Sequence, residues 1–177
     1  VKDNINYEWV HPSEIEYLWK EIVEPYFSDL KEVPKFGICH GAKLGKENSW
    51  FEKVSGMDFI GTDLIIENNS EMKLINWAFH KTKPEWINKF DVVYSNALDH
   101  AHDPGLALRN WISSLTQNGV CILEHTSFHQ VSTPTDPYGA TLREYKTLAL
   151  KNGGEILGDF EFSRNRKKNF LLLKRKQ

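Results

Sequence analysis

Cysteine is scarce in this chain of 177 residues, which contains only Cys39 and Cys121. Each stands in an apolar run, and no CxxC spacing joins either of them to a second thiol. We therefore expect two buried thiols in a reducing compartment rather than a disulfide, which favours a cytoplasmic protein. Cysteines and histidines at the spacing of a zinc site are also missing, so no metal site is predicted.

The sequence also lacks an excess of positive charge and a long apolar run. The formal net charge is −2, whereas a protein that binds nucleic acid through its phosphates needs a basic surface, so nucleic acid is not an expected partner. No apolar run approaches the roughly 18 residues that span a bilayer. Residues 1–10 lack the apolar centre of a signal peptide. No membrane association is expected.

What the sequence does contain is enough apolar material for one core. Hydrophobic residues make up 40% and charged residues 26% of the chain, which fits a single domain over residues 1–177. Residues 1–34 are expected to form a helical extension, because Ile15, Leu18 and Trp19 recur at helical spacing after a capping Ser13. Residues 35–177 are expected to form an α/β core.

Apolar strands and amphipathic helices alternate through that core. Strands are predicted at residues 35–39, 57–63, 73–79, 90–96, 120–125, 155–163 and 170–175, and helices at 45–54, 106–115 and 141–151, with a turn at 116–119. Single helices between strands imply right-handed crossovers and a parallel sheet. Because the last two strands have no helix between them, we predict a mostly parallel α/β sheet with an antiparallel C-terminal edge hairpin and helices on both faces.

Polar or small residues follow three of the predicted strands. Gly41 and Gly45 come after the first strand, Asp63 ends the second and Asn96 ends the fourth. Ligands of such sheets bind at the carboxyl ends of the strands, where glycines let the main chain approach and a carboxylate can bind a ribose. Other interpretations stay open: the glycines fit a tight turn, and Asp63 fits the N-cap of a helix.

Three segments, FGICHGAKLG, FIGTDL and FDVVYSNALDHAHDPGLALRNWISSLTQNGVCILEH, resemble the class I, seven-stranded S-adenosylmethionine-dependent methyltransferases. In that family a glycine-rich loop follows the first strand, an acid ends the second, and a phrase like S-x-x-L-E-H ends the fourth. The similarity covers residues 35–125 and continues in order to the closing hairpin. It implies a Rossmann-like sheet and S-adenosylmethionine as the cofactor.

The resemblance also implies which residues bind the cofactor. Gly41 and Gly45 match the loop under the methionine moiety, and Asp63 matches the ribose-binding acid. Leu64, Phe79 and His80 match positions near the adenine, and Asn96, or its neighbour Ala97, would present a backbone or side-chain oxygen to the cofactor's amino group. Two further residues are predicted because the chain departs from the family pattern. His40, or backbone groups, would compensate for Cys39, which replaces an acid, and Lys43, which replaces a glycine, would reach the cofactor carboxylate. The family usually has an acid after the third strand that binds the adenine amine, and this chain has Ala78 near that position.

Methyl transfer to a hydroxyl or an amine needs an aligned acceptor and a base that takes its proton. The predicted catalytic residues are Asp99 and His100, after the fourth strand, and His125, after the fifth. His100 resembles the histidine of the family's L-E-H phrase, which often has a packing or loop-positioning role, so both roles stay open. His102 and His129 lie in the same two loops as weaker candidates.

The acceptor is predicted to be a small molecule, such as a sugar or another biosynthetic metabolite, because the sequence offers no basic face and no large insertion. Two other functions stay open. A non-catalytic S-adenosylmethionine-binding or scaffold domain is consistent with the departures at Cys39, Lys43 and Ala78. A nicotinamide-dependent oxidoreductase expects G-x-G-x-x-G after the first strand, and the G-x-x-x-G of this chain does not match it.

Overall fold

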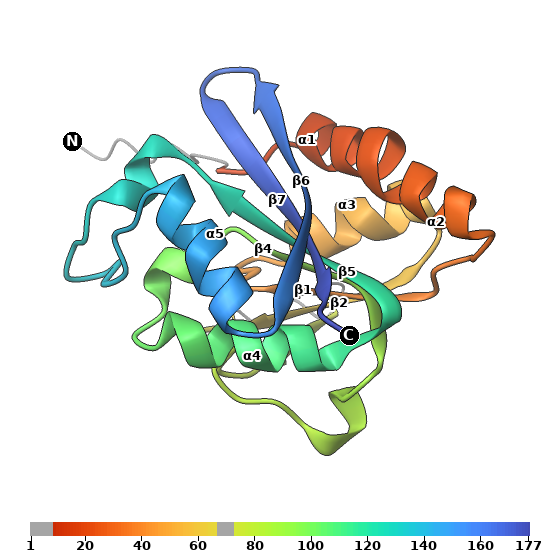
Figure 1. The fold of residues 1–177 in the computed structure, drawn as a ribbon, viewed down its shortest axis with the longest axis horizontal. Helices are drawn as coiled ribbons and strands as arrows, with labels where there is room; N and C mark the ends of the chain where they lie inside the picture. The colour runs from red at the N-terminus through yellow and green to blue at the C-terminus, as the bar shows by residue number, and fades with distance from the viewer. Residues whose placement is uncertain (1–8, 67–72) are drawn as a thin grey trace.

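A seven-stranded sheet forms the centre of the protein in the computed structural model, which describes residues 9–66 and 73–177 (Figure 1). The strand order is β3-β2-β1-β4-β5-β7-β6. The strands are β1 (Phe36–His40), β2 (Asp58–Asp63), β3 (Leu74–Asn76), β4 (Phe90–Ser95), β5 (Leu115–His125), β6 (Gly154–Ser163) and β7 (Lys167–Arg175). Neighbouring strands from β3 to β5 are parallel, and β7 is antiparallel to both β5 and β6. The predicted sheet is confirmed.

Helices cover both faces of this sheet (Figure 1). One face carries α1 (Pro12–Tyr17), a π-helical segment (Leu18–Val23), α2 (Glu24–Leu30) and α3 (Lys46–Ser55), and the other carries α4 (Pro104–Ser114) and α5 (Leu142–Lys151). Short 3-10 helices lie between these elements, at Pro84–Trp86, Leu98–His100 and Ser127–Gln130. None of these described helices combines the length and apolarity that a bilayer crossing requires.

Two apolar cores result, one on each face of the sheet. Successive side chains of a strand point to opposite faces, so Cys39 and Tyr94 enter the core under α1 and α3, while Ile38 and Val93 enter the core under α4 and α5. Burial on both faces explains why the central strands are continuous apolar runs in the sequence. Cys39 and Cys121 lie in different cores as free buried thiols, as expected.

Two local predictions were wrong. The capping residue of the first helix is His11, whose ring accepts a hydrogen bond from the Ser13 amide, because an imidazole nitrogen can replace a hydroxyl as the acceptor. Residues 116–119 are part of β5 rather than a turn before it. The register shifts there, since Phe90 pairs with Leu115 and Val92 with Val120, so the extra residues bulge out of the ladder.

Candidate functional site

The loop after β1 is held close to the tips of β2 and β4. Gly41 and Gly45 both have φ of 73°, in the left-handed region that favours glycine. The amides of Gly41 and Ala42 donate to the carbonyl of Thr62 at 2.9 and 3.0 Å. A β-carbon on Gly41 would lie 2.5 Å from the Ala97 β-carbon. The glycine at position 41 is therefore required both by its backbone angle and by this close approach.

Asp63 lies at the tip of β2 and binds the same loop. One carboxylate oxygen accepts from the Lys43 amide at 2.8 Å and the other from the Ile65 amide at 3.1 Å. A carboxylate has about four lone-pair sites, so roughly half of its acceptor capacity is left for a ligand. The next side chains, Leu64 and Ile65, are 65% and 78% exposed. Within the described residues, Asp63 accepts hydrogen bonds from the glycine loop and from the turn after β2. It does not cap the first turn of a described helix.

The His40 side chain faces the interior rather than the carboxyl edge of the sheet. Its ring is 4% exposed, its Nδ1 lies 2.8 Å from the Thr62 hydroxyl, and it stacks on Trp111 with ring centres 5.1 Å apart. Its carbonyl accepts from the Ser95 hydroxyl. Burial lowers the pKa of the imidazole to about 3. The predicted role of His40 at the cofactor stays a prediction, and the ring is neutral and packed.

Acid is expected to destabilise the fold through His40. The unfolded chain takes up a proton near pH 6.5, but the folded ring does so only near its pKa of about 3, so stability falls as the pH drops through that window. Between pH 7 and pH 5, protonation of this residue in the unfolded chain should lower the free energy of unfolding by about 2 kcal/mol. Urea unfolding of the wild type and of His40→Gln at both pH values measures it. An equal acid loss in the two proteins would contradict the assignment.

Further residues that were predicted to bind the cofactor lie near the glycine loop. Ala97 lies against Gly41, and the Phe79 ring is 3.9 Å from the place of a Gly41 β-carbon. Asn96 is half-buried at the tip of β4. The His80 ring instead stacks on His102, with centres 3.8 Å apart, and its Nε2 accepts from an amide of the α4 N-cap region. The fold thus brings Phe79 and Ala97 to the glycine loop, with Asn96 next to Ala97 after β4, while the His80 ring contacts Phe79 and His102.

Asp99 and His100, two of the predicted catalytic residues, lie together with a residue that the sequence did not single out, Asp136. His100 Nδ1 is 2.8 Å from Asp136 Oδ1, and its Nε2 is 4.0 Å from Asp99 Oδ1. Asp99 is 8% exposed, and burial raises the pKa of its carboxyl. The sequence signal that could have revealed Asp136 is its position in the long polar loop after β5. The length of a loop does not tell which distant residue it will contact, so His100 could not be predicted as its partner.

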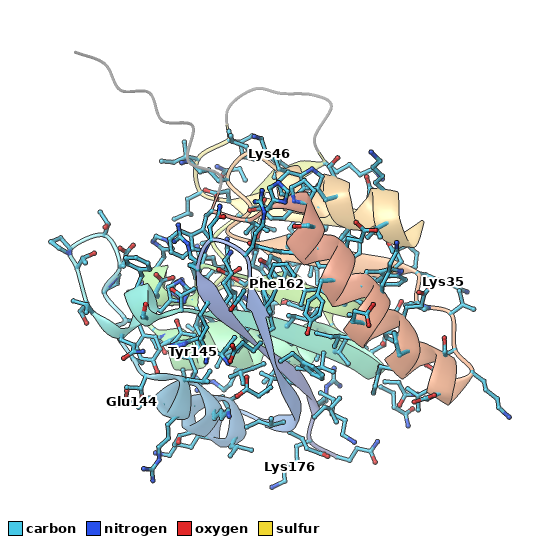
Figure 2. The ribbon with its side chains drawn as sticks, turned by 90° about the horizontal axis from the view of Figure 1, so that it is seen from above. Lys35, Lys46, Glu144, Tyr145, Phe162 and Lys176 are labelled. Atoms are coloured by element: carbon cyan, nitrogen blue, oxygen red, sulfur yellow. The ribbon has the colours of Figure 1, made fainter. Side chains whose placement is uncertain are left out.

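His125, the third predicted catalytic residue, is inside the protein. It is 2% exposed, its Nε2 donates to the Ala140 carbonyl at 2.9 Å, and its ring meets Tyr145 edge to face. Burial lowers the pKa of this imidazole. Figure 2 shows Tyr145 between α5 and the sheet, while the next residue back, Glu144, lies on the outer side. His125 therefore takes part in the packing of α5 against β5.

A buried ionic network beside β5 was missed by the sequence reasoning. Lys168 is 1% exposed, and its Nζ lies 2.7 Å from Glu14, 3.1 Å from Glu124 and 2.7 Å from the Trp9 carbonyl. The Trp9 indole and the Tyr94 hydroxyl donate to Glu124 at 2.6 and 3.1 Å. Burial raises the pKa of Glu124 to about 7. An acid inside the apolar strand VCILEH was the available signal.

Comparison with known proteins supports the fold through solved structures alone. No family model and no curated protein matches the chain. The 1,6-didemethyltoxoflavin-N1-methyltransferase of Burkholderia thailandensis, with bound S-adenosylhomocysteine, superposes with a TM-score of 0.68 at 12% identity, over 98% of this chain and 94% of that one.

Two further structures superpose over similar lengths. A TehB-like S-adenosylmethionine-dependent methyltransferase from Corynebacterium glutamicum has a TM-score of 0.61 at 15% identity, over 94% and 100% of the two chains. A putative S-adenosylmethionine-dependent methyltransferase from Listeria monocytogenes has 0.66 at 14%, over 93% and 100%. This chain has the seven-stranded fold of the class I S-adenosylmethionine-dependent methyltransferases.

Proposed function

We propose that the protein is an S-adenosylmethionine-dependent methyltransferase acting on a small-molecule acceptor. The observation that carries this proposal is the arrangement at the carboxyl edge of the sheet. The left-handed loop at Gly41 lies against the tip of β4, and Asp63 at the tip of β2 keeps acceptor capacity. Ligands of parallel sheets bind at this edge, near the point where the strand order reverses between β1 and β4.

The residues at this edge fit the cofactor. Asp63 can accept the ribose hydroxyls on its remaining lone pairs, and the exposed side chains of Leu64 and Ile65 offer an apolar surface to the adenine. Helix α3 begins after Gly45 without a side-chain cap, and the positive end of its dipole favours a negatively charged group such as the cofactor carboxylate, near the exposed Lys43. When bound, the cofactor supplies an activated methyl group on a sulfonium.

The family pattern has an acid at the position where this chain has Cys39. We infer that Glu47, in the first turn of α3, takes the role of that acid. Burial raises the pKa of the Cys39 thiol, so this side chain carries no charge at neutral pH, and the charge of Glu47 acts on it from the first turn of α3. Burial raises the pKa of Glu47 to about 7. A cationic ligand beside Glu47 would favour its ionised form. We therefore assign the cofactor's ammonium group to Glu47 rather than to His40.

We propose that the acceptor binds beside Asp99 and His100, two of the predicted catalytic residues, which come from the 3-10 helix after β4. A small-molecule acceptor is supported by the kind of protein that shares the fold, since one acts on 1,6-didemethyltoxoflavin and another is the CMeT domain of the citrinin polyketide synthase. The role of the chain in the reaction is to align the acceptor with the methyl group and to receive a proton.

Titration calorimetry with S-adenosylmethionine tests the proposal. We expect binding by the wild type, and Asp63→Ala should weaken it by about 1–3 kcal/mol, the range for hydrogen bonds to a charged group. Asp58→Ala is the matched control, because Asp58 lies at the opposite end of β2 and pairs with Lys73 on the surface.

The same titration separates the alternatives. If S-adenosylmethionine released no heat, the proposal would fail, and binding of NADH instead would indicate an oxidoreductase. Binding without turnover over a panel of hydroxylated and amino acceptors would favour the non-catalytic binding domain. Unchanged affinity in Asp63→Ala would remove this residue from the ribose site.

A further inference from the structure

His100 lies one short helical turn from the glycine loop. The 3-10 helix Leu98–His100 begins after Ala97, and the His100 amide donates to the Ala97 carbonyl at 3.2 Å. A β-carbon on Gly41 would lie 2.5 Å from the Ala97 β-carbon, so the start of this helix lies against the loop. Three residues of a 3-10 helix rise by roughly 6 Å. The His100 side chain is 51% exposed, so an acceptor bound beside the loop can reach its ring.

Asp99, His100 and Asp136 form a cluster where the loops after β4 and β5 meet. The Tyr138 amide donates to the Asp99 carbonyl at 2.9 Å, which attaches the second loop to the 3-10 helix. His100 Nδ1 lies 2.8 Å from Asp136 Oδ1 and 3.2 Å from the Thr135 carbonyl. Both of these groups are acceptors, so in the neutral ring Nδ1 carries the hydrogen and Nε2 has the lone pair.

The Asp136 carboxylate is oriented by its own loop. Its Oδ2 accepts from the hydroxyls of Thr133 and Thr135 at 2.9 and 3.3 Å, and its amide donates to the Thr133 hydroxyl at 3.0 Å. The other oxygen, Oδ1, is directed to His100. A carboxylate fixed in this way sets both the tautomer and the direction of an imidazole, as the aspartate of a Ser-His-Asp triad does.

Asp99 lies on the opposite side of the same ring. Its Oδ1 is 4.0 Å from His100 Nε2, whereas Asp136 contacts Nδ1. A positive charge that forms on the imidazole while it takes a proton would therefore lie between two carboxylates, which attract it. Groups that are already placed where charge develops need no rearrangement during the reaction. The cluster thus suits a histidine that acts as a base through Nε2.

We propose that Asp136 is a positioning residue for methyl transfer, which holds the hydrogen of His100 on Nδ1 and directs Nε2 to the acceptor as the base. This inference rests on the proposed function. The hydroxyl or amine of the acceptor gives its proton to Nε2. Its oxygen or nitrogen forms a bond to the methyl carbon, and the electron pair of the broken carbon–sulfur bond stays on sulfur. The imidazolium then releases the proton to water.

Nitrogen NMR of the histidine rings, at pH 8 and without S-adenosylmethionine, tests the tautomer. We expect His100, identified by the loss of its signals in His100→Gln, to carry its hydrogen on Nδ1. Two buried rings are internal controls with the opposite tautomer. His125 Nε2 donates to the Ala140 carbonyl, and His129 Nδ1 accepts from the Thr126 amide, so both carry the hydrogen on Nε2.

Variants of Asp136 test which residue sets this tautomer. In Asp136→Ala the His100 signals should move toward a mixture of the two tautomers, because only the longer bond to the Thr135 carbonyl is left. Asp136→Glu, which keeps the carboxylate, should restore the signals. A hydrogen on Nε2 of His100 in the wild type would overturn the proposal, and so would unchanged His100 signals in Asp136→Ala.

Turnover of an acceptor from the panel measures the catalytic consequence. His100→Gln should lower kcat by about 100-fold to 10,000-fold, the range for general acid–base catalysis, and Asp136→Ala by about tenfold or more. Asp136→Glu should recover part of the loss. The KM for S-adenosylmethionine should stay near the wild-type value, because both residues lie outside the proposed cofactor site. A wild-type kcat in Asp136→Ala would contradict the positioning role.

The outcomes separate this inference from the proposed function. If the wild type did not bind S-adenosylmethionine, the proposed function would fail and the base role with it, even with the expected tautomer. If the cofactor bound but His100 carried its hydrogen on Nε2, only this inference would fail. Asp136→Ala changes a side chain that is 30% exposed, so the variant should fold, and urea unfolding verifies this.

Discussion

Replacement of Lys168 by alanine is expected to lower the free energy of unfolding by about 3–5 kcal/mol. The ammonium is 1% exposed and lies within 3.1 Å of both Glu14 and Glu124, which are 6% and 1% exposed. Without it, two buried carboxylates would have no cation beside them, and a buried charge without a partner is costly. Urea unfolding at neutral pH measures the loss.

Two further variants separate charge from volume at this position. Lys168→Met keeps most of the volume and removes the charge, so it should be destabilised as well. Lys167→Ala removes the adjacent lysine, whose ion pair with Glu161 is on the surface, and should change stability by only about 0.5 kcal/mol. Wild-type stability in Lys168→Met would show that the ammonium does not compensate the two acids.

The loss at Lys168 is also expected to depend on pH. Burial already raises the pKa of Glu124 to about 7 with Lys168 present, and removal of the cation raises it further. A folded-state pKa above that of the unfolded chain means that the folded state binds more protons, so stability falls as the pH rises. The difference between Lys168→Met and the wild type should therefore be larger at pH 8 than at pH 5.

Substitution of Gly41 by alanine is expected to cost about 2–5 kcal/mol of stability and to weaken S-adenosylmethionine binding. The left-handed φ of 73° costs an alanine about 1–2 kcal/mol. The new β-carbon would lie 2.5 Å from that of Ala97, and relief of such overpacking costs about 1–3 kcal/mol more. Because Ala97 follows the tip of β4, the loop would be displaced at the proposed cofactor site.

Gly56→Ala is the matched control for this prediction. Gly56 has φ of 72°, but a β-carbon there would meet no atom within 4 Å, so only the cost of the backbone angle applies, about 1–2 kcal/mol. The difference between the two variants isolates the contact with Ala97. Equal losses of stability, with unchanged cofactor affinity in Gly41→Ala, would show that the loop does not depend on this close approach.

The sequence was sufficient for the order of the elements and for the main-chain part of the site. Periodicity and buried apolar runs predict the strands and helices, because they reflect contacts between near neighbours and burial on one or both faces. The glycines of FGICHGAKLG predict a left-handed turn, and Gly41 and Gly45 adopt it. Asp63 lies at the tip of β2, as its position in FIGTDL predicts.

Only the tertiary structure decided which side chains meet. Lys168 lies in the polar segment between the two predicted C-terminal strands, yet contacts with Glu14 and Glu124, from distant segments, bury it. His40 and His125 each stand at the end of an apolar strand, where site residues are expected. Side chains of α4 and α5, which come later in the sequence, cover their rings and bury them.

The same holds for the cluster at the carboxyl edge, where Asp136 reaches His100 from another loop. Local patterns determine what a segment becomes, whereas burial, partners and pKa values arise between segments that are far apart in the sequence, so they depend on how the crossovers place them.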